Sequence, residues 1–286
     1  MPELPEVETI ARLLRQGGPE SQSLLGKRII SVRLLWERTL VTPSPAELEA
    51  RLTGQIFQDI SRRGKFLVFH LSGGDKLVFH LRMSGDMLLQ PDDSPPAPHD
   101  RLIITLNDAH RLAFNDARKF GRAWLVSDLQ TITRRLGPEP LDPDFTPDEL
   151  YGRLQDYRRQ IKPLLLDQSF LAGLGNIYAD EALHMAGIHP LRISNSLDYS
   201  DAERLWRSIR QVLQEGIRLS GASIDWVYRG GEFQNQFRVY QRAGEACPVC
   251  QTPIRRIVVG QRGTHYCPVC QTAPEERGQD LSRRTL

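Results

Sequence analysis

The sequence predicts an α+β protein with a β-rich N-terminal half, a helical middle and a small cysteine-bearing hairpin near its end. Three observations predict this arrangement. Short runs of β-forming residues follow one another closely up to about residue 126, helical periodicity begins after a proline-rich segment, and all four cysteines lie in the last forty residues. Short strands with little helix between them are typical of a β-sandwich or a barrel-like domain.

The N-terminal half begins with a short helix. The run from Glu6 to Gln16 follows Pro5, and it has an apolar stripe and acidic residues in its first turn, where the helix dipole favours them. A Gly-Gly-Pro sequence ends this helix. Further strands are expected over 66–71, 77–81, 102–106, 112–114 and 123–126, the first two joined by a hairpin turn.

The segment 137–147 carries four prolines and is the predicted boundary between the halves. Beyond it, helices are expected over 147–157, over 177–186 and towards residue 219, the last opened by a capping box of Ser200 and Glu203. The expected division is an N-terminal domain (1–136), a linker (137–147), a helical domain (148–236), the cysteine hairpin (237–271) and a tail (272–286).

The cysteines form two C-x-x-C pairs, Cys247 with Cys250 and Cys267 with Cys270. Each pair places two thiolates on one tight turn, and two such turns can close a tetrahedron around Zn²⁺. Four thiolates leave no open position, so we predict one structural zinc ion. With four thiolates present, His265 is expected on the hairpin surface rather than at the metal. The alternative is four reduced cysteines that pack a small core.

The composition argues against disordered and membrane-spanning classes. Hydrophobic residues make up 40% of the chain and charged residues 25%, and no apolar run approaches the roughly 18 residues of a spanning helix. The acidic N-terminus lacks the features of a signal peptide, so a cytoplasmic protein without membrane contact is expected. Basic residues gather towards the C-terminus, which is typical of a protein with a polyanionic partner or of a solvated basic surface.

The N-terminus is itself a candidate chemical group. Removal of Met1 is expected and leaves Pro2 as a secondary amine with a pKa near ~8, so a neutral fraction exists at pH 7. A neutral amine can attack an electrophilic sugar carbon and form a Schiff base. Glu3 and Glu6 lie close by and can transfer a proton or orient the site. Composition alone favours the alternative, in which the prolines and glutamates merely start a helix.

Six motifs, in the right order and spanning nearly the whole chain, resemble those of the formamidopyrimidine-DNA glycosylase family. They are MPELPEVE (1–8), RRGKFL (62–67), HLRMSG (80–85), DARKFG (116–121), IKPLLLDQSFLAGLGNIYADEAL (161–183) and QRGTHYCPVCQ (261–271). The resemblance implies an N-terminal β-sandwich with the nucleophile on its first helix, a helix–two-turn–helix region and a zinc-ribbon hairpin. It also implies a monomer that binds damaged double-stranded DNA between its halves.

The activity implied by the resemblance is that of a bifunctional DNA glycosylase and AP lyase of base excision repair, which removes 8-oxoguanine and formamidopyrimidines. Pro2 would attack C1′ of the damaged nucleoside, and Glu3 would protonate the sugar ring oxygen while Glu6 holds the site. Successive β- and δ-eliminations from the Schiff base would follow. Lys65 matches the family's phosphate binder at the catalytic site, a role that suits its compact charge.

Further residues match the family's DNA contacts. Met83, Arg118 and Phe120 match the trio that fills the void left by an extruded base, although Met83 and Phe120 can also be core residues between strands. Three more matches are phosphate contacts: Lys162, Asn176 after Gly173-Leu174-Gly175, and Arg262 on the turn of the zinc hairpin.

Departures from the family pattern are few. Arg82 stands where many members have glycine, which indicates a stiffer loop or a phosphate contact, and the stretch 220–236 aligns least well. Two alternatives stay open: an endonuclease VIII-like enzyme for oxidised pyrimidines, and a non-catalytic zinc-ribbon protein that binds DNA damage. Leu4 and the DARKF motif argue against the first. The intact set of Pro2, Glu3, Glu6 and Lys65 argues against the second.

Overall fold

The computed structural model describes residues 1–18, 22–93, 95–223 and 230–273. The chain forms two compact units, and each unit combines segments that are distant in the sequence. The first unit contains Met1–Asp142, Gln168–Gly175 and Leu213–Gln236, and the second contains Pro143–Asp167, Asn176–Val212 and Phe237–Leu286. The domain boundaries expected from the sequence stay predictions. No helix in the described ranges has both the length and the apolar character needed to cross a membrane.

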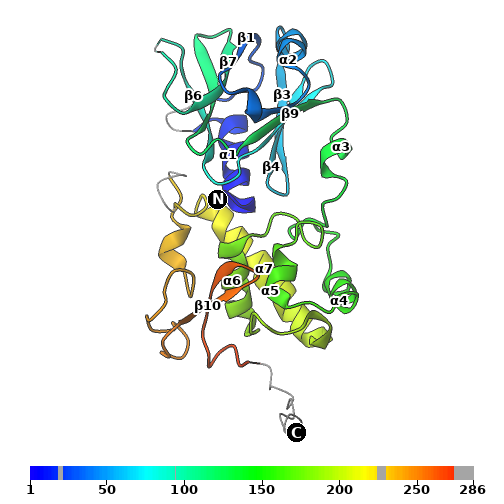
Figure 1. The fold of residues 1–286 in the computed structure, drawn as a ribbon, viewed down its shortest axis with the longest axis vertical. Coiled ribbons are helices and arrows are strands. Elements are labelled where there is room, and N and C mark those ends of the chain that lie inside the picture. The colour runs from blue at the N-terminus through cyan, green and yellow to red at the C-terminus, as the bar shows by residue number, and fades with distance from the viewer. Residues whose placement is uncertain (19–21, 94, 224–229, 274–286) are drawn as a thin grey trace, which may run out of the picture. The chain divides into compact units, whose positions relative to one another are not determined.

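Two β-sheets make up most of the first unit (Figure 1). The antiparallel four-stranded sheet has the order β1 (Ile29–Leu34), β7 (Asp100–Leu106), β8 (His110–Asp116) and β6 (Gly85–Pro91). The five-stranded sheet has the order β2 (Leu40–Thr42), β9 (Arg122–Val126), β5 (Lys76–His80), β4 (Phe66–Leu71) and β3 (Phe57–Arg63), with only β2 and β9 parallel. These sheets confirm the predicted N-terminal β-sandwich.

The core of the first unit lies between the sheets and the first helix. Phe79 of β5 and Phe114 of β8 bring the two sheets together, with ring centroids 5.1 Å apart. Helix α1 (Leu4–Gln16) packs on β3 and β4, and its buried stripe of Val7, Ile10 and Leu14 joins the same cluster. A fully buried Phe or Leu contributes about 1.5–3 kcal/mol, so the apolar stripe holds α1 against β3 and β4.

Smaller elements complete the first unit: η1 (Glu37–Thr39), α2 (Pro45–Leu52), α3 (Gln130–Thr133) and η3 (Phe233–Gln236). The sequence analysis did not predict α2, although a start signal is present. Ser44 caps the helix by accepting a hydrogen bond from the backbone N–H of Glu47, and Pro45 occupies its first turn.

The second unit is helical and carries the cysteine hairpin. Its elements are α4 (Pro147–Gln155), α5 (Ile161–Leu166), α6 (Asn176–Ala186), η2 (Ser194–Ser196), most of α7 (Tyr199–Arg218), β10 (Arg255–Val259) and β11 (Arg262–Tyr266). The helices predicted after the proline-rich segment are confirmed, and so is the hairpin.

The capping box predicted for the longest helix is wrong. The backbone N–H of Asp201 donates to Asp198 Oδ1 at 2.8 Å, and that of Asp198 donates to Asp201 Oδ2 at 3.4 Å. Asp198 therefore caps α7 two residues before Ser200. Glu203 instead forms an ion pair with Arg207 one turn later. Two aspartates provide the same reciprocal bonds as the Ser/Glu pair of the usual motif, so the capping box lies two residues earlier than predicted.

Candidate functional site

The candidate catalytic residues stand at the start of α1. Glu3 is the N-cap residue, and its backbone N–H donates to Glu6 Oε2 at 2.8 Å in a capping box. Pro5 occupies the first turn, where its missing N–H costs no helical hydrogen bond. Pro2, Glu3 and Glu6 are all buried. The helix start therefore holds the two carboxylates next to the residue that becomes the amino terminus once Met1 is removed.

Glu6 ties the start of α1 to the segment that follows α7. Its Oε1 accepts a hydrogen bond from the backbone N–H of Ala222 at 2.8 Å. Gly221 has a left-handed backbone conformation with φ 81°, and a Cβ there would lie 2.7 Å from Glu6 Oε1. Only glycine suits both the backbone conformation and the space. Glu6 is thus fixed by two backbone donors, as expected for a residue that holds the site.

The loop 172–175 lies against the start of α1 within the same unit. The backbone N–H of Leu4 donates to Gly173 O at 3.1 Å. A Cβ on Gly175 would lie 2.2 Å from Glu3 Cδ, and a Cβ on Gly173 would lie 2.7 Å from Leu4 Cδ1. The sequence analysis related these glycines to a close phosphate. Their near neighbours in the structure are Glu3 and Leu4, so any side chain at residue 175 would displace the Glu3 carboxylate.

Lys65 belongs to a two-residue turn between β3 and β4. Gly64, the other turn residue, has φ 58°, and a Cβ there would lie 3.5 Å from Ala172 Cβ and 3.6 Å from Gly173 N. The loop that contacts Leu4 and Glu3 therefore also contacts the turn that carries Lys65. The loop thus lies between Glu3 and the turn of Lys65, while Pro2 and Glu6 flank Glu3 at the start of α1.

His80 borders the same turn and is neutral. Its ring packs edge-on against Phe66, with centroids 4.9 Å apart. Burial lowers the pKa of His80 to about 3, and the charges of Arg82 and Lys65 act in the same direction. The His80 ring is therefore uncharged at neutral pH.

Met83, Arg118 and Phe120 lie on two loops that are held together. Met83 is 40% exposed and Phe120 is 47% exposed, so neither is a core residue. The guanidinium of Arg118 lies 5.1 Å from the centroid of the Phe120 ring. Asp116 joins the loops, because its Oδ1 accepts from the Ser84 hydroxyl and its Oδ2 accepts from the Gly121 N–H.

The second unit contains the other predicted DNA contacts. Lys162 is fully buried, and its Nζ donates to Gly263 O at 3.0 Å and to Thr264 Oγ1 at 2.7 Å, and pairs with Asp180 Oδ1 at 2.6 Å. Asn176 Nδ2 donates to the same carbonyl of Gly263 at 3.0 Å. Both residues support β11. The DNA contacts expected of them stay predictions.

Arg262 is the first residue of β11 and is exposed. The turn before it consists of Gly260 and Gln261, which both have positive φ (54° and 62°), as a type I′ hairpin requires. The arginine therefore stands directly after the turn, on a strand whose next two residues are anchored by Lys162.

The four cysteines meet at one point of the second unit. All their Sγ atoms lie within 4.8 Å of one another, and the closest pairs are Cys250–Cys267 at 3.4 Å and Cys247–Cys270 at 3.8 Å. Zn–S bonds of about 2.3 Å in a tetrahedron require S···S separations of about 3.8 Å. The donor set and its spacing fit one structural zinc ion, and the thiols form no disulfide.

The expected surface position of His265 is wrong. His265 is only 7% exposed, its backbone N–H donates to Asp180 Oδ2 at 2.9 Å, and its ring packs edge-on against Tyr240. The physical reason is that one face of the hairpin is covered by α6, so the side chain at this alternating position is buried. It does not belong to the group of possible metal ligands among the described residues.

Three family profiles match consecutive parts of the chain. They are the formamidopyrimidine-DNA glycosylase N-terminal domain over residues 1–123, the formamidopyrimidine-DNA glycosylase H2TH domain over 136–227, and the zinc finger found in FPG and IleRS over 244–273. The chain belongs to the formamidopyrimidine-DNA glycosylase family.

Individual relatives agree. A formamidopyrimidine-DNA glycosylase of Herpetosiphon aurantiacus is 44% identical over 91% of this chain and 96% of its own length. One of Symbiobacterium thermophilum is 45% identical over 96% of this chain and 90% of its own length. A structure of the Lactococcus lactis enzyme with DNA that contains an abasic site superposes with a TM-score of 0.88, at 40% identity, over 95% of this chain and 100% of the other.

The family assignment confirms the predicted resemblance and the predicted fold, and it agrees with the structural zinc site. The stretch 220–236, which aligns least well with the family, falls only partly within the structure, because residues 224–229 lie outside the described ranges. The tail predicted over 272–286 likewise lies outside them from residue 274 onwards.

Proposed function

We propose that this member of the formamidopyrimidine-DNA glycosylase family removes oxidised purines, 8-oxoguanine and formamidopyrimidines, from duplex DNA in base excision repair, and that it also cleaves the resulting abasic site. One observation carries the proposal. The residue that becomes the amino terminus is buried and directly precedes Glu3, and Glu3 lies against the loop that also contacts the turn of Lys65. Relatives solved with DNA that contains an abasic site or carbocyclic 8-oxo-G support the substrate class.

The proposed reaction begins with the processed chain, because Pro2 is an amide while Met1 is attached. The lone pair of the Pro2 amine forms a bond to C1′, and the C1′–base bond breaks as the base leaves with a proton. Glu3 protonates the sugar ring oxygen as the C1′–O4′ bond opens, which gives a Schiff base. Loss of a C2′ proton then expels the 3′ phosphate, and a second elimination expels the 5′ phosphate.

The remaining residues are proposed to serve DNA binding. Lys65 binds a phosphate at the reaction centre, and Arg262 and Asn176 bind phosphates around the lesion. Lys162 supports these contacts from below, because its buried ammonium holds β11 in place. The exposed Met83, Phe120 and Arg118 replace the stacking and pairing that an extruded base leaves behind. A monomer in the bacterial cytoplasm, at the nucleoid, is the proposed working form.

Borohydride trapping tests the activity. The protein is incubated with a duplex carrying 8-oxoguanine opposite cytosine, or with one carrying thymine glycol, and borohydride is added. We expect a covalent adduct on the first duplex that maps to Pro2. Trapping with thymine glycol alone favours the endonuclease VIII-like alternative, and binding without any adduct leaves only the non-catalytic alternative.

Replacement of Pro2 tests whether its amine is the nucleophile. Pro2→Gly exchanges the secondary amine for a primary one on a more mobile backbone, so excision should fall by at least tenfold while lesion binding stays largely intact. Excision by gel assay and binding by fluorescence anisotropy provide the measurements. Equal loss of both would contradict the role of Pro2.

A further inference from the structure

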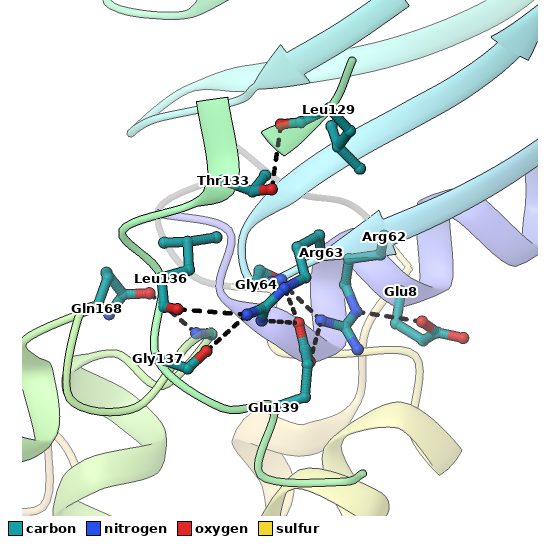
Figure 2. A network of polar contacts seen from close by, with 11 residues as sticks. Glu8, Arg62, Arg63, Gly64, Leu129, Thr133, Leu136, Gly137, Glu139 and Gln168 are labelled. Carbon is teal, nitrogen blue, oxygen red and sulfur yellow. Dashed lines mark hydrogen bonds and ion pairs between the residues drawn. The ribbon is translucent and has the colours of Figure 1, made fainter. Parts of the chain in front are cut away.

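Glu139 lies at the centre of a polar cluster that the proposed reaction does not use. The cluster consists of Glu139, Arg62, Arg63 and Glu8, and Figure 2 shows both arginine side chains directed at the Glu139 carboxylate. Arg62 Nη1 donates to Glu139 Oε2 at 2.7 Å, and Arg63 Nη1 donates to Oε1 at 2.9 Å. The residue comes from the proline-rich segment, which the sequence analysis treated only as a linker.

The same carboxylate also binds the turn that carries Lys65. The backbone N–H of Gly64 donates to Glu139 Oε1 at 2.5 Å. Arg62 Nη1 donates to Gly64 O at 3.0 Å as well. The cluster therefore binds both backbone polar groups of Gly64, the N–H and the C=O. Gly64 directly precedes Lys65 in the chain. Charge-assisted bonds of this kind are about twice as strong as neutral ones.

A second set of bonds runs from the cluster to the loop 172–175. Arg63 Nη2 donates to Gly137 O at 2.6 Å, and the Gly137 N–H donates to Gln168 O at 2.8 Å (Figure 2). The side chain of Gln168 accepts from the Gly173 N–H and donates to Leu174 O, both at 2.9 Å. One carboxylate and its arginines thus connect the Lys65 turn with the loop that contacts Glu3.

The flanking prolines make Glu139 a stiff support. Pro138 and Pro140 fix the φ angle on either side of it, which lowers the conformational entropy that ordering this segment costs. Pro138 O also accepts from the Ala172 N–H at 3.0 Å. The segment is therefore anchored to the loop by its backbone as well as by its side chain.

The basic run Arg62-Arg63-Gly64-Lys65 looks like a phosphate-binding site in the sequence, but its arginines are already engaged. Arg62 is 10% and Arg63 is 28% exposed at the side chain, and each pairs with a carboxylate. Glu8 Oε2 accepts from Arg62 Nε at 3.2 Å, and Glu8 Oε1 accepts from Arg12 Nε at 2.7 Å. Both arginines of the run are therefore held by carboxylates next to the Gly64–Lys65 turn.

We propose that Glu139 is a positioning residue for lesion cleavage, which acts by fixing the Gly64–Lys65 turn and the loop 172–175 relative to each other. The proposal rests on the proposed function for its effect on turnover. Glu139 itself touches neither DNA nor the reacting atoms. Because a displacement of about 1 Å can cost about 100-fold in rate, the loss of this support should lower turnover far more than DNA binding.

The test compares Glu139→Gln with a matched control, Asp75→Asn. Asp75 is paired with Arg51 through two hydrogen bonds, and both carboxylate side chains are 16% exposed. Asp75 lies in the turn at the other end of β4, away from Lys65. We expect Glu139→Gln to lower kcat for 8-oxoguanine excision by about 10- to 100-fold with less than a threefold change in KM. Asp75→Asn should keep the wild-type kcat, and its melting temperature should be similar to that of Glu139→Gln.

Two further measurements separate positioning from a general loss of stability. In a Lys65→Ala background, Glu139→Gln should add less than threefold, because the residue acts through Lys65, and Glu139→Asp should restore part of the lost kcat. Amide hydrogen exchange should speed up together in 61–66 and 170–175 for Glu139→Gln, and in neither segment for Asp75→Asn. This measurement does not depend on activity.

The outcomes separate the two proposals. A wild-type protein that cleaves no oxidised purine overturns the proposed function, and the exchange experiment then still decides whether Glu139 couples the two segments. The role given to Glu139 would be overturned if Glu139→Gln kept the wild-type kcat or if Asp75→Asn lost as much kcat. It would also be overturned if Glu139→Gln lowered kcat as much in the Lys65→Ala background as in the wild type, or if amide exchange did not speed up together in the two segments.

Discussion

The β-sandwich of the first unit and the cysteine hairpin of the second are stabilised by different means. The sandwich buries a continuous apolar cluster that draws on both sheets and on α1, with Phe57, Phe69, Phe79 and Phe114 at 0% exposure. The buried cluster of the hairpin, among the described residues, consists of Val239, Ile254 and two of the cysteines. Apolar burial is sufficient for the first, whereas the second needs a metal to close its core.

The two regions also differ in the contacts that fix the positions of their functional side chains. Around Glu3, precision comes from close backbone approach and from carboxylates that accept buried hydrogen bonds. The position of Arg262 is fixed by Lys162 and Asn176, which bind the backbone of β11, and by the four cysteines that cluster in the same hairpin region. A perturbation of one region should therefore leave the stability of the other unchanged.

Removal of zinc should have the largest effect. Structural zinc contributes about 10–16 kcal/mol to the folding of small zinc modules, and the hairpin has little apolar core to replace it. Circular dichroism and amide exchange after chelation should show 237–271 unfolded while the sandwich keeps its exchange protection, and DNA binding should be lost. An apo-protein that still binds DNA tightly would contradict the role given to the hairpin.

Phe79→Ala tests the sandwich in the same way and should cost about 3–5 kcal/mol. Phe79 is fully buried and packs against Phe69 and Phe114, so its truncation leaves a cavity between the sheets. Urea denaturation gives the free energy of unfolding, and zinc content by chelator titration should stay at that of the wild type. Loss of zinc in this variant would show that the two regions are not stabilised independently.

The pH dependence of stability should report on His80. Its pKa in the folded state is about 3, below the ordinary value of 6.5, so the unfolded state binds the extra proton between these values. Stability is therefore unaffected above pH 6.5 and decreases as the pH falls, by about 2 kcal/mol at pH 5. His80→Gln should flatten this part of the curve in urea titrations at several pH values, and an unchanged slope would contradict the prediction.

Arg82→Gly should have the smallest effect. Arg82 has φ 56°, a conformation that costs an L-residue roughly 1 kcal/mol and costs glycine nothing. The gain is opposed by the larger entropy of glycine in the unfolded chain, so the free energy of unfolding should change by less than about 1 kcal/mol. A loss of more than 2 kcal/mol in urea denaturation would show that the Arg82 side chain stabilises the loop.

The sequence predicted the features that depend on local pattern. The strand runs, the helix after Pro5 and the spacing of the cysteines were sufficient for the fold class and the zinc site. The positive φ of Arg82 is a conformation that glycine adopts without strain. Features that depend on distant contacts were missed. The burial of His265 results from its contacts with Asp180 and Tyr240, and the role of Glu139 depends on arginines more than seventy residues earlier.

Lys162 gives the protein a built-in chemical reporter. The chain has only five lysines, and acylating reagents label amines that solvent reaches. The Lys162 ammonium, fully buried beneath β11 and bound to Gly263 and Thr264, should resist such labelling as long as the hairpin is seated on α5 and α6. Mass spectrometry of the peptide that contains Lys162 would therefore follow the loosening of the hairpin directly, without DNA and without a spectroscopic label.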